Sequence, residues 1–146
     1  KLQHTLREFP GLIPRFVEEV VRLESPFKGH YRVVTRATEL GGQHLPDNAR
    51  VLLLWAAANR DPAEYTLPDK ADLARAKPRE HLAYGQGMHF CVGARLARME
   101  ARVILEELLS STAHFSIPED FTPRYVASIF VRRLSELVLV LKPRLE

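Results

Sequence analysis

Cysteine is almost absent from this sequence, because Cys91 is the only one among 146 residues. A single cysteine excludes an intramolecular disulfide, and a free thiol fits a reducing compartment such as the cytoplasm. Long apolar runs are missing as well. The longest extends over eight residues, from Val51 to Ala58, whereas a membrane-spanning helix needs about 20. We therefore expect a cytoplasmic protein without a membrane span.

An excess of charge of one sign is also missing, since 21 Lys and Arg residues oppose 18 Asp and Glu residues and leave a net charge of +3. So small a charge, without a nucleic-acid motif or aromatic residues between the basic ones, argues against a nucleic-acid partner. The length suits a single domain. The first residues, from Lys1 to His4, contain no Met and begin no secretory leader, so we expect the sequence to begin within a longer protein.

Two segments have the pattern of helices. Pro14 suits a first helical turn, and Pro26 disfavours helical geometry at Ser25, which together predict a helix over residues 14–24. The strongest helical pattern runs over residues 94–109, where apolar residues recur at spacings of three and four. We expect this second helix to be buried over a wide face.

Strand patterns occupy the middle of the chain. Residues 31–40 are rich in strand-forming residues, and Gly41-Gly42 permits a tight reversal into residues 43–45, which predicts a β-hairpin. Residues 51–59 begin like a strand and end in an alanine run that favours helix.

The second half of the chain contains an irregular segment and two more strand patterns. Residues 61–83 hold three prolines and no sustained period, which predicts a long functional loop. Residues 125–131 and 137–141, separated by 132–136, are predicted to be two paired closing strands.

Cys91 stands between a glycine-bearing loop and the second predicted helix. The unpaired N–H groups and the positive dipole end of a helix N-terminus favour a thiolate. Gly85 and Gly87 allow the backbone to approach a flat ligand closely, and the small residues Gly93 and Ala97 keep the start of the helix slim. The pattern therefore favours a thiolate that faces a flat ligand.

Other roles for Cys91 have to be weighed against this one. A lone cysteine is often a small buried residue of the core. A cysteine nucleophile with His81 or His89 as its base is a second alternative, although no oxyanion-hole motif accompanies them. Zinc needs about four ligands, and His81, His89 and Cys91 leave the set incomplete.

Residues 84–93 read Tyr-Gly-Gln-Gly-Met-His-Phe-Cys-Val-Gly, which resembles the haem-binding signature of cytochromes P450, F-G-x-G-x-H-x-C-x-G. Tyr84 stands where the family usually has Phe, so the aromatic ring is kept and a hydroxyl is added. The resemblance implies that Cys91 is the axial thiolate on the iron of haem b. It also implies a cofactor-binding set of Tyr84, Gly85, Gly87, His89, Cys91, Gly93 and Ala97.

Three further motifs extend the resemblance along the chain. Glu19-Val20-Val21-Arg22 is similar to the E-x-x-R helix of the family, residues 59–62 to its N-R-D-P motif, and Arg75 to its third charged partner. The resemblance implies that Glu19, Arg22 and Arg75 form a buried structural network beneath the haem. The alternative is an ordinary solvated pair at i,i+3, which contributes only a few tenths of a kcal/mol.

The resemblance also implies contacts around the edge of the haem. Arg32, three residues before Thr35, is similar to the position whose guanidinium binds a haem propionate, and a planar fork suits a carboxylate. His89 matches a second propionate contact. Four residues are implied on the substrate side: Phe27, Lys28, Phe130 and Val131.

The fold implied by the resemblance is α+β and mainly helical, with small β-hairpins, an irregular meander loop and a cysteine-ligand loop followed by a long helix. Residues 1–146 would form one partial domain, the C-terminal haem-binding part, because the distal A/G-G-x-D/E-T pattern is missing from the sequence. The part implied here therefore lacks the distal half of the fold that is typical of the family.

The implied activity is that of a haem-thiolate monooxygenase, which inserts one oxygen atom of O₂ into a small organic substrate. A ferredoxin or flavodoxin would supply electrons through a basic face formed by Lys77, Arg79, Arg95, Arg98 and Arg102. The alternative is a truncated haem-binding module without turnover.

Overall fold

The structure, a computed structural model, describes residues 1–144. The α-helices are α1 (Leu2–Glu8), α2 (Ile13–Glu24), α3 (Trp55–Ala58) and α4 (Ala94–Ser111). Short 3-10 helices cover Pro10–Leu12, Leu82–Tyr84 and Gly87–His89. The strands are β1 (His30–Val33), β2 (Thr38–Leu40), β3 (Gln43–Leu45), β4 (Arg50–Leu53), β5 (Thr112–Ser116) and β6 (Val140–Pro143). This mixture confirms the predicted α+β class.

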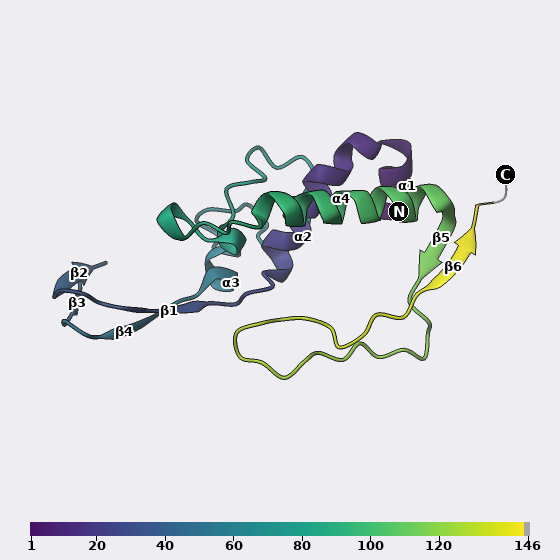
Figure 1. The fold of residues 1–146 in the computed structure, drawn as a ribbon. Coiled ribbons are helices and arrows are strands. Elements are labelled where there is room, and N and C mark those ends of the chain that lie inside the picture. The colour runs from purple at the N-terminus through teal and green to yellow at the C-terminus, as the bar shows by residue number, and fades with distance from the viewer. Residues whose placement is uncertain (145–146) are drawn as a thin grey trace.

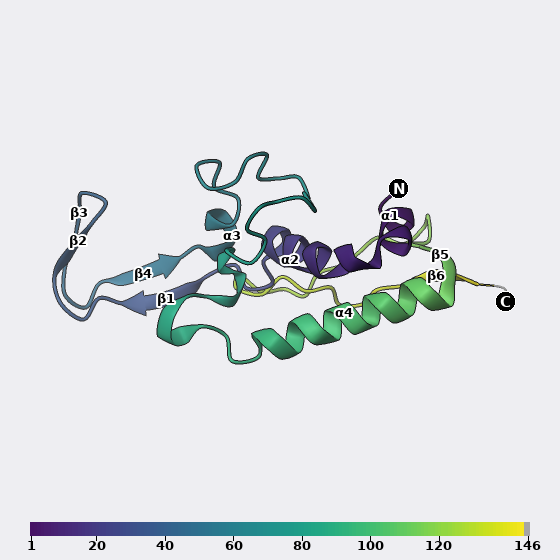
Figure 2. The same cartoon turned by 90° about the horizontal axis from the view of Figure 1, so that it is seen from above.

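Helix α2 forms where the prolines predicted it and begins one residue earlier, at Ile13. It ends at Glu24, and the next residue, Ser25, has a φ of 37° in the left-handed region, directly before Pro26. Helix α4 packs beside α2, and α1 lies against the far end of α4 (Figure 1, Figure 2). A small core of Leu6, Ile13, Val17 and Leu109 joins the three helices.

The expectation that α4 is buried over a wide face is wrong for this chain. Among its described residues only Ala94 and Leu109 are buried. Four large apolar side chains are between 43% and 64% exposed: Leu96, Met99, Val103 and Ile104. The helix has more apolar surface than α1 and α2 can cover, which is why the amphipathic pattern overestimates its burial.

The strands form three separate two-stranded antiparallel sheets. Strand β1 pairs with β4, with His30 opposite Leu53 and Val33 opposite Arg50. The predicted hairpin is confirmed: β2 and β3 reverse direction at Gly41 and Gly42, whose φ values of 57° and 75° need glycine. The four strands make a ribbon that extends from the helices to one end of the molecule (Figure 1).

The pairing predicted between residues 125–131 and 137–141 is wrong. Residues 125–131 contain isolated bridges, of which one joins Val131 to Phe27 in the segment after α2. Strand β6 pairs with β5, which starts at the last turn of α4 and was not predicted. Both predicted strands thus have partners distant in sequence and do not pair with each other. A local pattern does not contain those distant segments, so it cannot identify the pairing.

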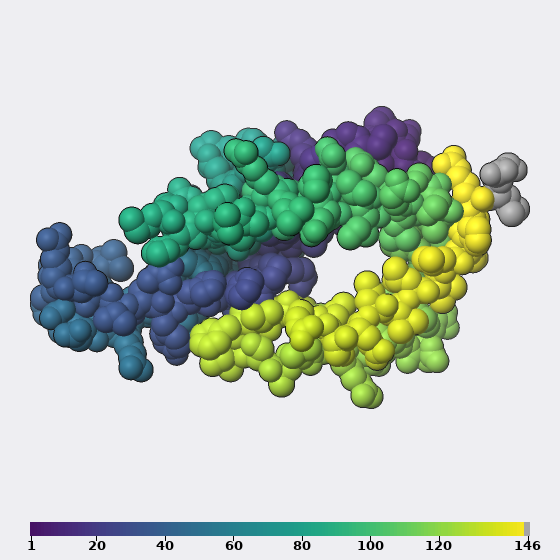
Figure 3. All heavy atoms as spheres, in the orientation of Figure 1, coloured from purple at the N-terminus to yellow at the C-terminus, as the bar shows by residue number. Residues whose placement is uncertain are grey.

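Residues 61–81 contain neither helix nor strand, as the prolines predicted. Asn59, from the N-R-D-P motif, is fully buried and its side chain donates to Ser25 Oγ over 2.9 Å. On the opposite side of the molecule, the segment between β5 and β6 arches away from α4 and leaves an opening that Figure 3 shows. In the described part of the chain, no helix has the length and apolarity to cross a membrane.

Candidate functional site

The loop before α4 is closed by its own backbone. The N–H of Cys91 donates to the carbonyl oxygen of Tyr84 over 2.8 Å, and the N–H of Ala94 donates to the carbonyl oxygen of Cys91 over 3.2 Å. Gly85 and Gly87 adopt φ values of 74° and 70°, which ordinary side chains disfavour. The loop therefore holds an exposed free thiol directly ahead of a helix N-terminus.

Cys91 lines a cavity of about 610 Å³. Its walls bring together most residues of the implied cofactor set: Arg32, Tyr84, Gly85, His89, Cys91 and Ala97. Gly87 and Gly93 contribute through the loop backbone and are not part of this lining. A Cβ on Gly93 would lie 3.8 Å from Sγ of Cys91, which is ordinary contact. The small residue is therefore not needed at position 93 to make room for sulfur.

The sequence did not indicate two ring-bearing residues of this cavity, His30 and Trp55. The indole N–H of Trp55 donates to Nδ1 of His30 over 2.7 Å, and the ring of Phe27 stacks on His30 at 5.4 Å between centroids. His30 and Trp55 are 25 residues apart, and neither belongs to a motif quoted above. Only the pairing of β1 with β4 brings them together, so the sequence alone offered no signal for them.

The four residues expected on the substrate side lie close together. Phe27 and Val131 form a β-bridge, and the N–H of Lys28 donates to the carbonyl oxygen of Phe130 over 2.7 Å. Among these four, Phe27 is the one that lines the cavity in the described part of the chain. Arg32 reaches the cavity from β1, and its guanidinium donates to the carbonyl oxygen of Tyr31 over 2.9 Å.

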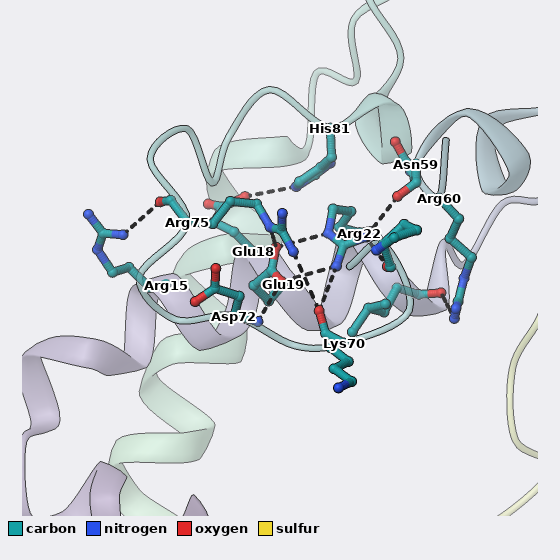
Figure 4. Close-up of polar contacts among 12 residues, drawn as sticks. Arg15, Glu18, Glu19, Arg22, Asn59, Arg60, Lys70, Asp72, Arg75 and His81 are labelled. Carbon is teal, nitrogen blue, oxygen red and sulfur yellow. Dashed lines mark hydrogen bonds and ion pairs between the residues drawn. The ribbon is translucent and has the colours of Figure 1, made fainter. Parts of the chain in front are cut away.

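Glu19 and Arg22 of α2 meet Arg75 of the irregular segment (Figure 4). Arg22 donates to both carboxylate oxygens of Glu19, from Nε over 2.9 Å and from Nη2 over 3.0 Å. Nε of Arg75 and the backbone N–H of Asp72 add bonds of 3.0 and 2.9 Å. The Glu19 side chain has no exposed surface. Burial alone would raise its pKa, but these donors lower it from 4.5 to about 2.

Arg22 also fastens the irregular segment to α2. Its Nη1 donates to the carbonyl oxygens of Asn59 and Pro68 over 2.8 and 2.7 Å, and its Nη2 donates to that of Lys70 over 3.2 Å (Figure 4). The Tyr65 ring lies 4.9 Å from the guanidinium carbon. A single buried cation therefore binds the backbone at the end of α3 and at two places along the irregular segment.

Glu18, the neighbour of Glu19, forms a second buried cluster that the motifs did not indicate. It accepts two hydrogen bonds from Arg98, over 2.7 and 3.0 Å, and lies 3.0 Å from Nε2 of His81. Burial alone would raise the pKa of Glu18, but hydrogen bonds from His81 and Arg98 outweigh it and lower the pKa below 4.5. The Arg98 side chain therefore points toward the buried Glu18 carboxylate.

The expected basic face is accordingly less charged than the sequence suggested. Arg98 is committed to Glu18, and its side chain is only 20% exposed. Two of the other cations face carboxylates on their own segments, Lys77 with Glu80 at 3.0 Å and Arg102 with Glu106 at 3.6 Å. Arg98 therefore contributes less charge to this face than its sequence position suggests, because a buried carboxylate from α2 reaches it. The docking role of the face stays a prediction.

Across residues 1–144, no group of three or more His, Cys, Asp or Glu residues is arranged to hold a metal ion by itself. Cys91 is thus a lone soft donor in a mainly apolar cavity.

Comparison with known proteins agrees with this geometry. A family model described as Cytochrome P450 matches residues 8–133. Cytochrome P450 144 of Mycobacterium tuberculosis is 45% identical over 141 residues, which cover 97% of this chain and 32% of the relative. Beta-dihydromenaquinone-9 omega-hydroxylase of Mycobacterium bovis is 37% identical over 139 residues, which cover 95% of this chain and 28% of the relative.

The fold is also shared with solved structures. Substrate-free cytochrome P450 CYP150A6 of Mycobacterium marinum superposes with a TM-score of 0.93 at 37% identity, over 97% of this chain and 37% of that one. The chain thus spans about a third of the length of the relatives that it matches. The family model, the identities and the shared fold together show that this chain belongs to the cytochrome P450 family.

Proposed function

We propose that this chain is the cysteine-ligand part of a haem-thiolate monooxygenase, with haem b in the 610 Å³ cavity and Cys91 as its axial ligand. The observation that carries the proposal is the convergence of the only thiol with Arg32, His89 and Ala97 on one cavity. The volume lies within the range of about 300–1,000 Å³ that is typical of cofactor and ligand sites.

The walls of the cavity fit a flat macrocycle with acidic edges. Gly85 has a φ of 74°, so a larger residue would strain the backbone at this wall, although a Cβ there would lie 3.4 Å from the carbonyl oxygen of His89, close to ordinary contact. Ala97 lines the cavity from α4, and its small side chain leaves space for a flat ligand. Arg32 and His89 line the same cavity, and a guanidinium suits a propionate carboxylate. The residues present therefore fit haem.

Each part of the chain has a separate task in this function. Bound haem with a thiolate ligand supplies the chemistry of O₂ activation and oxygen insertion. The Tyr84 carbonyl fixes the Cys91 backbone through its 2.8 Å hydrogen bond. The Glu19–Arg22–Arg75 network holds the irregular segment against α2. Phe27, Lys28, Phe130 and Val131 border the substrate side.

The chemistry of the substrate is proposed at the level of class. The name of the mycobacterial omega-hydroxylase describes oxygen insertion into an organic molecule, which supports the same reaction type here. Phe27 presents an apolar ring to the cavity, so a small organic substrate with an apolar portion suits this edge.

A ferredoxin or flavodoxin would supply electrons at the basic face that includes the start of α4. A groove of about 450 Å³ supports this proposal, because Arg95 and Arg102 line it beside Phe90 and Met99. Arg79 and Arg98 line it too, but both face Glu18. Acidic redox proteins are attracted by such a lining. The reducing compartment that keeps Cys91 a free thiol is, in this proposal, the cytoplasm.

A second candidate is a haem-binding module without turnover. The exposed apolar face of α4, with Ile104 64% and Leu96 53% exposed, favours it because surfaces of this kind lack packing partners. A monooxygenase also needs substrate positioning and proton delivery, and the chain covers about a third of its relatives.

One experiment tests the proposal and separates the two candidates. The purified protein is loaded with haem, supplied with a ferredoxin reductase system and a substrate panel, and assayed for product and for electrons consumed. Oxygenated product in proportion to electrons supports the monooxygenase. Tight haem binding that is lost in Cys91→Ala, without product, supports the module. Haem binding that is the same in wild type and Cys91→Ala refutes both.

A further inference from the structure

Glu18 joins three segments that are distant in sequence. Its carboxylate accepts two hydrogen bonds from Arg98 on α4, meets Nε2 of His81 at 3.0 Å, and lies 3.5 Å from Nε of Arg79. The Glu18 side chain is 5% exposed and that of His81 is fully buried. Figure 4 shows His81 reaching down from the loop toward Glu18 on α2. The cluster is outside the E-x-x-R network, which uses Glu19.

The His81 ring has a defined proton arrangement. Its Nδ1 accepts the backbone N–H of Ala83 over 3.2 Å, so this nitrogen carries no proton. A neutral imidazole must then carry its proton on Nε2, which donates to Glu18. The same side chain therefore caps the short helix Leu82–Tyr84 and binds the buried carboxylate.

Two of the partners of Glu18, Arg98 and His81, contact the ring of Tyr84, whose carbonyl oxygen binds the Cys91 N–H. The Arg98 guanidinium lies 4.4 Å above the Tyr84 ring, and the His81 ring lies 5.7 Å from it. The Tyr84 carbonyl oxygen in turn accepts the Cys91 N–H over 2.8 Å. A continuous set of contacts thus leads from the Glu18 carboxylate to the backbone of the thiol-bearing residue.

We propose that Glu18 is a positioning residue for Cys91: it holds Arg98 and His81 against Tyr84 and so fixes the geometry of the sulfur ligand. This inference rests on the proposed function, in which Cys91 binds haem iron. Outer partners that orient a ligand tune both its geometry and the potential of the metal. The role is specific to Glu18, because Glu19 pairs with Arg22 on its own helix and accepts its other bonds from the irregular segment.

Glu18→Gln tests this proposal because it keeps the size of the side chain and removes its charge. The matched control is Glu24→Gln on the same helix, whose carboxylate pairs with Arg132 at 2.8 Å but is 53% exposed. Two quantities are measured in the haem-loaded protein: hydrogen exchange at the Cys91 amide and the iron reduction potential. The exchange measurement is repeated without haem.

In Glu18→Gln we expect the Cys91 amide to exchange about tenfold faster or more, because its acceptor Tyr84 is no longer held. We also expect a more positive reduction potential, because a negative charge that disfavours the reduced state has been removed. Glu24→Gln should match wild type in both. A variant in which Arg98 is replaced, Arg98→Gln, should accelerate the same amide, and it carries the test if Glu18→Gln does not fold.

Wild-type exchange at Cys91 in a folded Glu18→Gln variant, or equal effects in Glu18→Gln and Glu24→Gln, would overturn the proposal. So would wild-type exchange in Arg98→Gln. A wild-type protein without thiolate-ligated haem would contradict the proposed function instead. The exchange data without haem then still decide whether Glu18 positions Cys91.

Discussion

Replacing Glu19 by Gln tests how the buried network contributes to stability. The Glu19 carboxylate accepts hydrogen bonds from Arg22, Arg75 and the backbone of Asp72, and its side chain is fully buried. Gln keeps the shape but brings no charge and only one acceptor oxygen. The guanidinium of Arg22, 1% exposed, would therefore stay buried without its counter-charge.

Two arguments give the magnitude of this effect. Breaking a buried ion pair by removing one partner costs about 3–5 kcal/mol. Independently, a carboxyl whose pKa falls from 4.5 to about 2 stabilises the folded state by about 3 kcal/mol at neutral pH, because a tenfold change in an ionisation constant is worth about 1.4 kcal/mol. The two values agree, and a typical domain has only about 5–15 kcal/mol in total.

The assay is urea denaturation, followed by the fluorescence of Trp55, the single tryptophan, and by circular dichroism. Glu19→Gln should lower the free energy of unfolding by about 3 kcal/mol or more. The exposed pair of Glu24 and Arg132 provides the control, and Glu24→Gln should cost about 1 kcal/mol or less. Equal effects of the two substitutions would refute a buried network and favour an ordinary solvated pair at Glu19 and Arg22.

Further outcomes follow from the same structure. The stability that Glu19 contributes is present above pH 4.5 and is lost as the pH falls toward 2, because the pKa of Glu19 is lowered in the folded state. In Glu19→Gln, the urea concentration at the midpoint of denaturation should therefore depend less on pH over that range. Gly29→Ala should destabilise by about 1–3 kcal/mol, because a Cβ there would lie 2.6 Å from the carbonyl oxygen of Leu53, whereas Gly11→Ala, with open space around it, should not. Electron delivery by an acidic ferredoxin should slow as salt rises and in Arg95→Glu, measured as the rate of iron reduction, and a rate that ignores both would remove the arginine-lined groove as the docking site.

Local patterns predicted the parts of the fold that depend on neighbouring residues. The prolines define α2, and Gly41 and Gly42 define the β2–β3 hairpin, because both act through their own backbone dihedrals. The closing strands were predicted incorrectly, since β6 pairs with β5, which is more than 20 residues away. Strand pairing depends on which segments meet in space, and a single segment does not contain that information.

At the site too, the sequence indicated residues that belong to a local motif and did not indicate those that meet only in the fold. The spacing around Cys91 indicated the ligand loop, and the E-x-x-R motif indicated Glu19 and Arg22, whose hydrogen-bonded pair is observed. The cluster of Glu18, His81 and Arg98 has no comparable spacing, with 63 and 80 residues between its partners. On a helix with exposed Val20 and buried Glu18 and Glu19, ordinary amphipathic reasoning assigns the polar residues to solvent.

The most direct test of the account is the spectrum of the reduced, carbon monoxide-treated, haem-loaded protein, compared between wild type, Cys91→Ala and His89→Ala. Thiolate ligation by Cys91 predicts a strongly red-shifted Soret band in wild type. The band should be absent in Cys91→Ala and should keep its position, with weaker haem retention, in His89→Ala, because His89 would contact only the edge of the haem. A red-shifted band that persists in Cys91→Ala would contradict the assignment of Cys91 as the ligand.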